Sequence, residues 1–424
     1  MRFFVAILAL FSANESPRFE RLNRASGLAR GRIDQSSGET VYVPFFEMAT
    51  ASGVGMGTEC ACTAITGTKG ETITFSRTGG AWCRKADFTF TYCSGASTPR
   101  VTVGETGQTI LGLMVERDAQ NLLLRNRDLS NAAWTKTNAT CTRDLVGLDG
   151  SANTATTCAA TASNGTASQA VTASGTRSTS FFAKRTVGTG TVRVTRDNGS
   201  NWIDITADLS SEWKRFQPQS CGNETKCVSK SGLATNVTNP TVVFEIATSG
   251  DAIGLDFIQD EDRVWATSPI DTAGSAVQRL RETALLTALS ADFTTYSMAA
   301  DVRPEYLSES YVVNLANGSS RNDLSTALGT GAIRFESYWG GTMTASSPVG
   351  WTANTPGTWH RVAGQWNGTA PKACMDGTCN TGTGTNTTQT TMTEFKIGYA
   401  VFAGTNTQGV IRKVCLDNTA TGCI

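Results

Sequence analysis

The sequence has a single histidine, His360, in 424 residues. Imidazole is the side chain most easily tuned to exchange protons near neutral pH, so a lone histidine is a candidate catalytic group. A Ser-His-Asp triad would have to be built on this one residue, and no G-x-S-x-G stretch accompanies it. The phosphate-cradling motifs of nucleotide-binding proteins are missing as well. These absences argue against a hydrolase with a Ser-His-Asp triad and against a nucleotide-binding enzyme.

Charge is scarce and balanced. Lys+Arg and Asp+Glu both number 36, the formal net charge is zero, and charged residues make up 17% of the chain. A basic surface that binds nucleic acid is therefore not expected. No run of about 18 apolar residues occurs, so no helical membrane span is expected.

The E-x-D-x-x-E strand of sandwich glucanases is also absent, although glycoside hydrolysis needs two carboxylates about 5–10 Å apart. The nearest acidic cluster contains Asp256, Asp260, Glu261 and Asp262. Strict alternation along a strand would put Asp256, Asp260 and Asp262 on one face, where their oxygens could bind Ca²⁺. The preferred alternative is a strand end that meets solvent, with no cofactor. A glycan-cleaving enzyme is kept as an alternative hypothesis.

What the chain does have is the composition of short strands joined by turns: 42 glycines and abundant Thr, Ser and Asn. Alternating runs such as TSFFAKR, GTVRVTRD and PTVVFEIAT fall within 121–280, and a second series with SYVVNLAN, AIRFESYWG and WHRVAGQW falls within 281–424. No helix-period stretch competes with them. The sequence therefore predicts an all-β fold of two antiparallel β-sandwiches. An irregular arm (1–50) and a cysteine-rich β lead-in region (51–120) precede them.

Twelve cysteines form an even set that falls into neighbouring groups. Local pairing of this kind is typical of disulfides made outside a reducing cytosol. The predicted pairs are Cys141–Cys158, Cys221–Cys227, Cys374–Cys379 and Cys415–Cys423. Cys60, Cys62, Cys83 and Cys93 form a further group whose internal pairing stays open. Four thiolates would also suit zinc, but the paired C-x-x-C spacing of common zinc sites is lacking, which favours disulfides.

The chain begins MRFFVAILALFSANES, with one arginine before an apolar run from Phe3 to Phe11. A secretory signal peptide has this layout, but Phe11 stands where a small residue is wanted before a cut at Ala13. The other hypothesis is an apolar arm that packs against a partner subunit.

The middle of the chain resembles a family of bacteriophage virion proteins, often tail- or fibre-associated. The stretch NLLLRNRDLSNAAWTKTNATCT is similar to the opening of that family's domain, and ETITFSR, STPRV and GLMVERDAQ precede it in the family's order. IGLDFIQDEDRVWATSPIDTAGSAVQR resembles the closing strand and connector. The resemblance covers about residues 70 to 280 and implies a jelly-roll sandwich similar to carbohydrate-binding modules. The many cysteines and Asp260-Glu261, where Leu-Glu is usual, depart from the pattern.

The C-terminal series resembles laminin G-like or concanavalin A-like sandwiches. The residues that carry this resemblance are Trp359-His360, Val362, Trp366, Asn367-Gly368 and Asp376-Gly377. In an extended strand His360, Val362 and Trp366 share one face. We therefore expect His360 to be a strand residue that hydrogen-bonds a loop, with no catalytic role.

Asp376-Gly377 is a strong signal for a two-residue hairpin, because a type I′ turn needs positive φ at both central positions. Met375 and Thr378 then flank the turn, and Cys374 and Cys379 become the next opposed pair, with Cα atoms about 4.5 Å apart. That distance suits a disulfide, so we predict a Cys374–Cys379 bond that fixes the register of the hairpin.

Sugar binding without cleavage needs exposed aromatic platforms. Trp339, in ESYWGGT, is the first candidate because Tyr338 adjoins it and a Gly-Gly turn follows. Trp351 and Trp202 are further candidates. The competing interpretation is packing, since most tryptophans in sandwiches are core residues.

Together these features predict a non-enzymatic structural protein of a phage particle, in the tail, a fibre or the capsid decoration. Its expected partners are other virion proteins, further copies of itself and host-surface glycans, with no nucleic acid and no membrane span. The expected location is the virion. A secreted or cell-surface bacterial adhesin built from the same modules is the first alternative, and the glycan-cleaving enzyme is the second.

Overall fold

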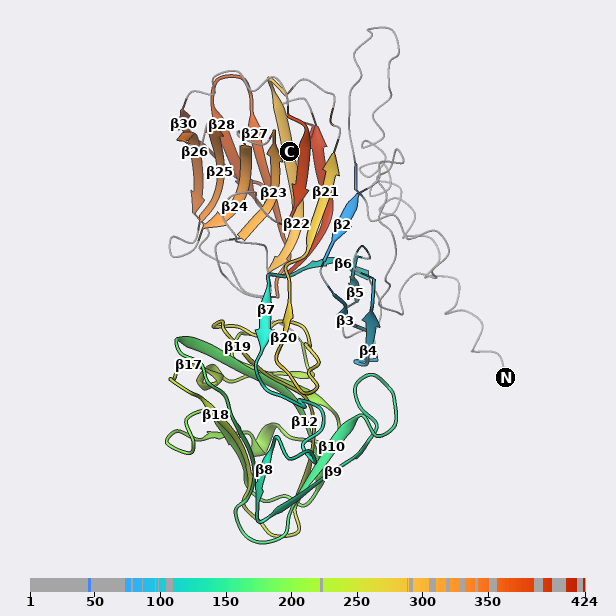
Figure 1. Ribbon diagram of the computed structural model, residues 1–424. Helices are drawn as coiled ribbons and strands as arrows, with labels where there is room; N and C mark the ends of the chain where they lie inside the picture. Colours follow the sequence, from blue (N-terminus) through green and yellow to red (C-terminus); the bar gives the residue numbers. More distant parts are fainter. Residues whose placement is uncertain are drawn as a thin grey trace, which may run out of the picture. The chain divides into compact units, whose positions relative to one another are not determined.

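The computed structural model shows an all-β protein (Figure 1). The residues that it describes are 45–46, 73–77, 79–85, 87–95, 97, 99–103, 110–221, 224–287, 289, 293–304, 310–317, 321–327, 332–339, 342–350, 357–384, 392–398, 409–417 and 422–423. Within them, the helical turns are two short 3-10 segments, η1 (Thr206–Asp208) and η2 (Ser231–Leu233). No helix in this part of the chain is long and apolar enough to cross a membrane.

The first sandwich has a nine-stranded and a five-stranded sheet. The larger sheet contains β16 (Cys227–Ser229), β15 (Lys214–Gln217), β12 (Thr176–Val187), β19 (Ala252–Glu261), β10 (Ala155–Ala160) and β9 (Ala139–Leu145), with β17 (Ala234–Asn236), β7 (Ala119–Asn121) and β20 (Val277–Arg279) attached. The smaller sheet contains β14 (Ile203–Asp204), β13 (Val192–Thr195), β18 (Thr241–Ile246), β11 (Gly165–Ala170) and β8 (Thr135–Thr137). The named strand pairs are antiparallel except β15–β16, which is parallel.

The alternation in β12 explains how this sandwich is filled. Phe181 faces the core between the two sheets, where its ring stacks on Phe216 of β15 and meets Phe244 of β18 edge-on. The next residue, Phe182, points to the outer face of the nine-stranded sheet. Because successive strand residues alternate, one apolar pair serves two different hydrophobic clusters.

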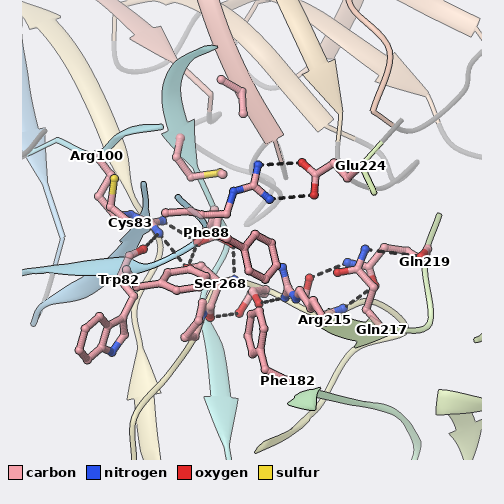
Figure 2. Close-up of a pocket in the computed structure, with 18 of the residues that line it drawn as sticks. Trp82, Cys83, Phe88, Arg100, Phe182, Arg215, Gln217, Gln219, Glu224 and Ser268 are labelled. Atoms are coloured by element: carbon pink, nitrogen blue, oxygen red, sulfur yellow. Dashed lines mark hydrogen bonds and ion pairs between the residues drawn. The ribbon is translucent and has the colours of Figure 1, made fainter. Parts of the chain in front are cut away.

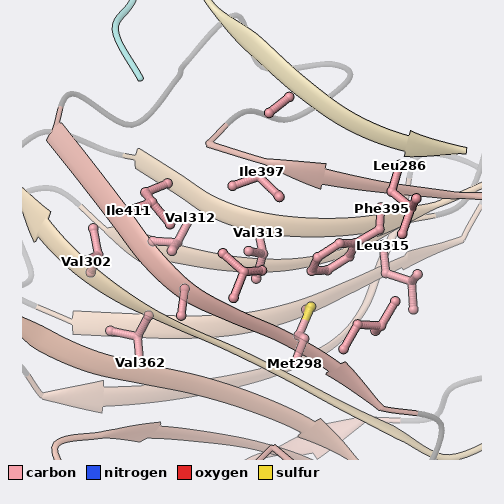
Figure 3. Packing of buried hydrophobic residues seen from close by; sticks show 14 of the residues in the cluster. Leu286, Met298, Val302, Val312, Val313, Leu315, Val362, Phe395, Ile397 and Ile411 are labelled. Carbon is pink, nitrogen blue, oxygen red and sulfur yellow. The ribbon is translucent and has the colours of Figure 1, made fainter. Parts of the chain in front are cut away.

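The second sandwich has two eight-stranded sheets. One contains β29 (Thr378–Thr381), β28 (Pro371–Met375), β27 (His360–Trp366), β22 (Tyr296–Pro304), β32 (Gly409–Asp417), β6 (Ile110–Val115) and β5 (Val101–Val103), with β1 (Phe45–Phe46) beside β32. The other contains β2 (Thr74–Ser76), β21 (Thr283–Thr287), β31 (Glu394–Ile397), β23 (Ser310–Ala316), β24 (Arg321–Ala327), β25 (Ala332–Trp339), β26 (Thr342–Gly350) and β30 (Thr383–Gly384). Figure 3 shows aliphatic side chains from both sheets, among them Met298, Val313 and Ile397, filling the space between them.

Strands from the lead-in region complete this second sandwich. β2 pairs with β21, and β6 pairs with β32 and β5. The sequence-based division had assigned residues 51–120 to a separate lead-in region, and short strands of this kind carry no local signal of the partner they will choose. The structure therefore closes the C-terminal sandwich with strands from the N-terminal side of the chain.

A separate hairpin, β3 (Ala81–Arg84) and β4 (Phe90–Cys93), packs on the outer face of the first sandwich. Phe88 and Phe90 meet Phe182 edge-on at 5.9 and 5.5 Å between ring centroids. Trp82 meets Phe257 of β19 in the same way at 5.0 Å. These aromatic contacts bury the hairpin's apolar side and fix its position on the sheet.

The predicted disulfides are formed. Cys141–Cys158, Cys221–Cys227, Cys374–Cys379 and Cys415–Cys423 all pair within their local groups. The Asp376-Gly377 turn has φ of 47° and 84°, and Cys374 stands opposite Cys379 with a Cα–Cα distance of 4.0 Å. The hairpin register predicted from the sequence is thus confirmed.

The fifth group of cysteines, Cys60, Cys62, Cys83 and Cys93, is settled only in part. Cys83 and Cys93 are both disulfide-bonded, which excludes them as zinc ligands. Cys60 and Cys62 lie outside the described residues, as do the arm at 1–41 and its apolar run.

Gly364 of β27 tests the packing of the second sandwich. A Cβ at this position would lie 2.3 Å from Cδ2 of Phe335, a fully buried ring on the opposite sheet. We expect Gly364→Ala to lower the free energy of unfolding by about 1–3 kcal/mol through overpacking. Chemical denaturation would measure the loss, and Gly274→Ala, where nothing lies within 4 Å of the added methyl, is the control. Equal stabilities of the two variants would contradict this packing.

Candidate functional site

Five buried ionic side chains gather where the lead-in strands meet the connector between the sandwiches. Arg100 donates to both Glu282, at 2.7 and 2.5 Å, and Glu116, at 2.5 Å. Arg77 donates to Glu282 at 3.0 Å, and Arg279 donates to Glu116 at 2.6 Å. Each of the five side chains is at most 2% exposed. We call this group the arginine–glutamate cluster.

Electrostatics keep Glu116 and Arg100 ionised although both are buried. Burial by itself would raise the pKa of Glu116, but Arg279 and Arg100 hold the pKa well below its ordinary value. Burial would lower the pKa of Arg100, yet Glu282 and Glu116 raise it. Opposite charges at hydrogen-bonding distance thus outweigh desolvation at both residues.

The cluster also holds the β3–β4 hairpin by its backbone. Arg100 donates to the carbonyl of Trp82 at 2.7 Å, and Arg77 donates to the carbonyl of Cys93 at 3.1 Å. Trp82 and Tyr92 stand opposite each other in the hairpin. The first contact therefore positions Trp82. The second positions Cys93, the neighbour of Tyr92.

A small cavity lies on one side of Trp82 (Figure 2). Its volume is about 60 Å³, and its far wall carries Glu224, which is bound by Arg84 at 2.8 and 2.9 Å and by Arg303 at 3.2 Å. Burial raises the pKa of Glu224, but the two arginines prevail and lower it to about 2. A cavity of this size holds a few water molecules and is too small for a sugar ring.

A larger, open cleft lies along the other part of the hairpin and also includes Trp82. Its volume is about 490 Å³, within the range of small-molecule sites. The residues that line it are Gly79, Gly80, Trp82 and Tyr92 from the hairpin, and Pro269, Ile270, Asp271, Thr272, Ala273, Val277, Gln278 and Arg279 from the connector. We call it the hairpin cleft.

Tyr92 is the exposed aromatic side chain of the hairpin cleft, with 50% of its surface accessible. Its ring lies 5.0 Å from the Trp82 ring, and a Cβ on Gly80 would stand 2.2 Å from its Cζ and Oη atoms. The ring end therefore rests on the Gly80 backbone, and a larger residue at position 80 would displace the ring. Trp82 and Gly80 hold Tyr92 in place from two sides.

Polar groups in the same cleft are of complementary kinds. The indole N–H of Trp82 and the Nε–H of Arg279 are buried and have no hydrogen-bond acceptor within the described part of the chain. The side chain of Asp271 is 44% exposed and lies 3.9 Å from the nearest arginine nitrogen, in Arg127. Burial raises the pKa of Asp271 above its ordinary value, against the opposing charge of Arg127. The cleft thus presents one exposed aromatic ring and one partly exposed carboxyl group, and two unpartnered donors are buried in its wall.

The sequence-predicted platforms lie elsewhere. Trp202 is half-buried, and the Arg193 guanidinium covers its ring at 4.4 Å, so the ring is engaged within the protein. Tyr338 and Trp339 end strand β25, but their side chains lie outside the described residues, and so does Trp351. Trp82 and Tyr92 carry only a weak signal in the sequence, because GGAWC and FTYC are two short β runs without a compact turn between them.

The prediction that Asp256, Asp260 and Asp262 share one face is wrong, because β19 contains a bulge. The pairing with β12 jumps from Ser180–Gln259 to Phe182–Asp256, and Phe257 has φ of 43°. An extra residue of this kind reverses the alternation. Asp256 consequently lies beside Phe257 on the outer face, while Asp260 follows Ile258 on the core face.

The preferred interpretation, a strand end that meets solvent, is wrong for Asp256 and Asp260, which are fully buried in contact with arginine side chains. Asp256 binds Arg127 at 2.7 Å, and Asp260 binds Arg177 at 2.5 Å and Arg196 at 2.9 Å. Asp262 is 56% exposed and lies 4.0 Å from Arg263. No group of three or more His, Cys, Asp or Glu side chains that could hold a metal ion occurs in the described residues.

His360 is a strand residue that contacts a turn, as the sequence predicts. It begins strand β27, is buried, and its Nδ1 lies 2.7 Å from Oδ2 of Asp376 in the hairpin turn. The same aspartate accepts the backbone N–H of Arg361 at 2.8 Å. The histidine thus secures the β28–β29 turn against the start of β27.

These features define the class of the protein: an all-β double sandwich crosslinked by local disulfides, with an added hairpin that forms a cleft. No protein-family model and no curated protein matches the chain. Among solved structures, domains LG4-5 of the mouse laminin alpha1 chain match with 10% sequence identity and a TM-score of 0.25. That match covers 73% of this chain and 92% of the laminin chain.

Glu261, next to the cavity wall at Thr267, gives a testable pH dependence. It is fully buried, and burial raises its pKa to about 7, against hydrogen bonds from Thr267 at 2.7 and 3.1 Å. The folded protein keeps a proton that the unfolded chain loses near the ordinary pKa of 4.5. Stability due to this group is therefore full below about pH 4.5 and is lost as the pH rises through 7.

We expect Glu261→Gln to remove this loss. Relative to the wild type, its free energy of unfolding should improve by about 3 kcal/mol between pH 4.5 and pH 8. Denaturation at several pH values would measure it, with Glu212→Gln, at a side chain that is 68% exposed, as the control. A difference that does not change with pH would contradict the raised pKa.

Proposed function

We propose that the chain is a non-enzymatic structural protein of a phage particle that contacts glycans on the host surface. The observation that carries the glycan part is the hairpin cleft, which combines the exposed Tyr92 ring with the partly exposed carboxyl group of Asp271. The phage setting rests on the resemblance of residues 70 to 280 to virion proteins. Other virion proteins and further copies of the chain are the proposed partners.

An extracellular location fits the covalent chemistry. Disulfides link neighbouring strands or loops in both sandwiches, at Cys141–Cys158 in the first and Cys374–Cys379 in the second. Such bonds form and persist in oxidising surroundings. A virion surface is one such setting, and a bacterial cell surface is the other.

The absence of catalysis is proposed from the state of the buried carboxylates. Glu116, Glu282, Asp256 and Asp260 are each held by arginine side chains, and Glu116 has a lowered pKa. A general acid for glycoside cleavage needs a raised pKa and access to the substrate. Burial raises the pKa of Glu261 and, against the charge of Arg127, that of Asp256, but both side chains are sealed from solvent.

Among the described residues, Asp271 favours the enzymatic alternative, because it combines a raised pKa with partial exposure in the hairpin cleft. We expect no release of reducing ends when the full chain is incubated with capsule or lipopolysaccharide preparations. Release by the wild type that Asp271→Asn abolishes would establish the glycan-cleaving alternative instead. The matched control is Asp262→Asn, at an exposed carboxylate.

The setting can be tested separately. Mass spectrometry of phage particles purified from a culture that produces the protein should find its peptides at a stoichiometry comparable to other virion proteins. Peptides confined to the cell envelope or the medium, and missing from the particles, would favour the secreted adhesin.

A further inference from the structure

We propose that the hairpin cleft binds a neutral pyranose residue of a glycan, stacked on Tyr92 and hydrogen-bonded by Trp82, Arg279 and Asp271. This inference rests on the proposed function and deepens it, since it names the subsite and the class of sugar. It moves the contact away from the tryptophans singled out in the sequence.

The first argument is the pair of unpartnered donors. Trp82 is 9% exposed and Arg279 is 3% exposed, and both line the hairpin cleft. The Trp82 indole N–H and the Arg279 Nε–H lack an acceptor within the described residues. Buried donors are rarely left unsatisfied, because the loss of hydration is not repaid. Both atoms are closed to solvent in this structure, so a ligand rich in oxygen atoms would reach them only after the Trp82 and Arg279 side chains turn toward the cleft.

The second argument is the placement of Tyr92. A hydrophobic ring with half of its surface exposed would ordinarily pack on the protein, yet Gly80 and Trp82 hold it at the cleft. Gly80 allows this because any side chain would collide with the ring. The axial C–H face of a pyranose is apolar and can cover such a ring, while its hydroxyls remain free to hydrogen-bond at the edge.

The third argument selects a neutral sugar. The positive charge of Arg279 is already matched by Glu116 at 2.6 Å. Asp271, by contrast, faces the cleft with a partly exposed carboxyl group, and its nearest arginine nitrogen is 3.9 Å away. A hydroxyl can donate to this carboxylate, whereas a sugar acid would be repelled by it.

The fit of the cleft is consistent with one ring. A volume of about 490 Å³ accommodates a monosaccharide with its linkage atoms and lies within the usual range for small ligands. The neighbouring cavity of about 60 Å³ does not. Figure 2 shows the Trp82 indole at the edge of the cavity residues, on the side away from Glu224.

The test uses the full chain on a glycan array that carries neutral oligosaccharides ending in glucose, galactose, mannose or N-acetylglucosamine, together with sialylated and uronic acid oligosaccharides. We expect binding to one or more neutral glycans and none to the acidic ones. Titration calorimetry with the best neutral oligosaccharide then compares variants. Tyr92→Ala should weaken binding by about tenfold, and Tyr92→Phe should retain it.

Two further variants separate the contacts from folding. Gly80→Ala should also weaken binding, since its methyl displaces the Tyr92 ring without removing it. Asp271→Asn should lose affinity for the neutral sugar and gain binding to acidic glycans. Val146→Ala, at an exposed residue that does not line the hairpin cleft, is the matched control, and thermal unfolding of every variant checks that it is folded.

The outcomes distinguish this inference from the function on which it rests. Neutral glycan binding that is insensitive to Tyr92, Gly80 and Asp271, but is lost in Trp339→Ala, would overturn the subsite and leave the proposed function standing. Binding of acidic glycans alone would overturn the sugar class. No binding to any glycan would overturn both the subsite and the glycan part of the proposed function.

Discussion

The arginine–glutamate cluster is the interaction on which the rest of the structure depends. It joins the ends of strands that are far apart in the sequence, since Arg100 and Glu282 are separated by 182 residues. Glu282 and Glu116 are also tied through their backbones, at 3.0 Å between nitrogen and carbonyl oxygen. Removal of one partner from such a buried network leaves an unpaired charge, which costs about 3–5 kcal/mol. The cluster therefore determines which segments of the chain lie together more strongly than a surface ion pair would.

That constraint reaches the hairpin cleft directly. The same guanidinium groups that bind the two glutamates donate to the carbonyls of Trp82 and Cys93. The aromatic pair on the hairpin is therefore positioned by arginine side chains. These arginines are themselves held by glutamates in the segments that connect the two sandwiches. A site built in this way keeps its geometry without contributing its own hydrophobic core, because the two-stranded hairpin alone would be marginally stable.

Local patterns in the sequence were sufficient for the parts of the fold that are local. The Asp376-Gly377 turn has the required positive φ values, and the cysteine pairs close loops of 5 to 17 residues. Alternation likewise predicted strand β27 and the direction of His360. In each case neighbouring residues determine the outcome, so spacing alone identifies it.

The remaining features depend on partners that spacing does not reveal. The sequence of strand β2 predicts a short strand, but nothing in it indicates that β21 is its neighbour. Trp82 and Tyr92 face each other only because a loop with Phe88 at φ 71° closes the hairpin. The sequence gives no indication of the bulge at Phe257 either, since the residue with positive φ is neither glycine nor asparagine. The candidate site could not be predicted from the sequence, because it depends on non-local strand pairing and on a strained backbone residue.

The bulge links the failure of strict alternation in β19 to the cleft. By reversing the alternation of β19, it turns Phe257 outward beside Asp256 instead of into the core. There Phe257 meets the Trp82 ring at 5.0 Å, and the Arg127 guanidinium lies over both rings, at 4.0 Å from Phe257 and 5.6 Å from Trp82. Arg127 in turn is held by Asp256 at 2.7 Å. An aspartate that strict alternation would assign to a metal site instead anchors the arginine that supports the aromatic wall. The cleft is consequently a property of the hairpin seated on a bulged strand, and neither sandwich would form it alone.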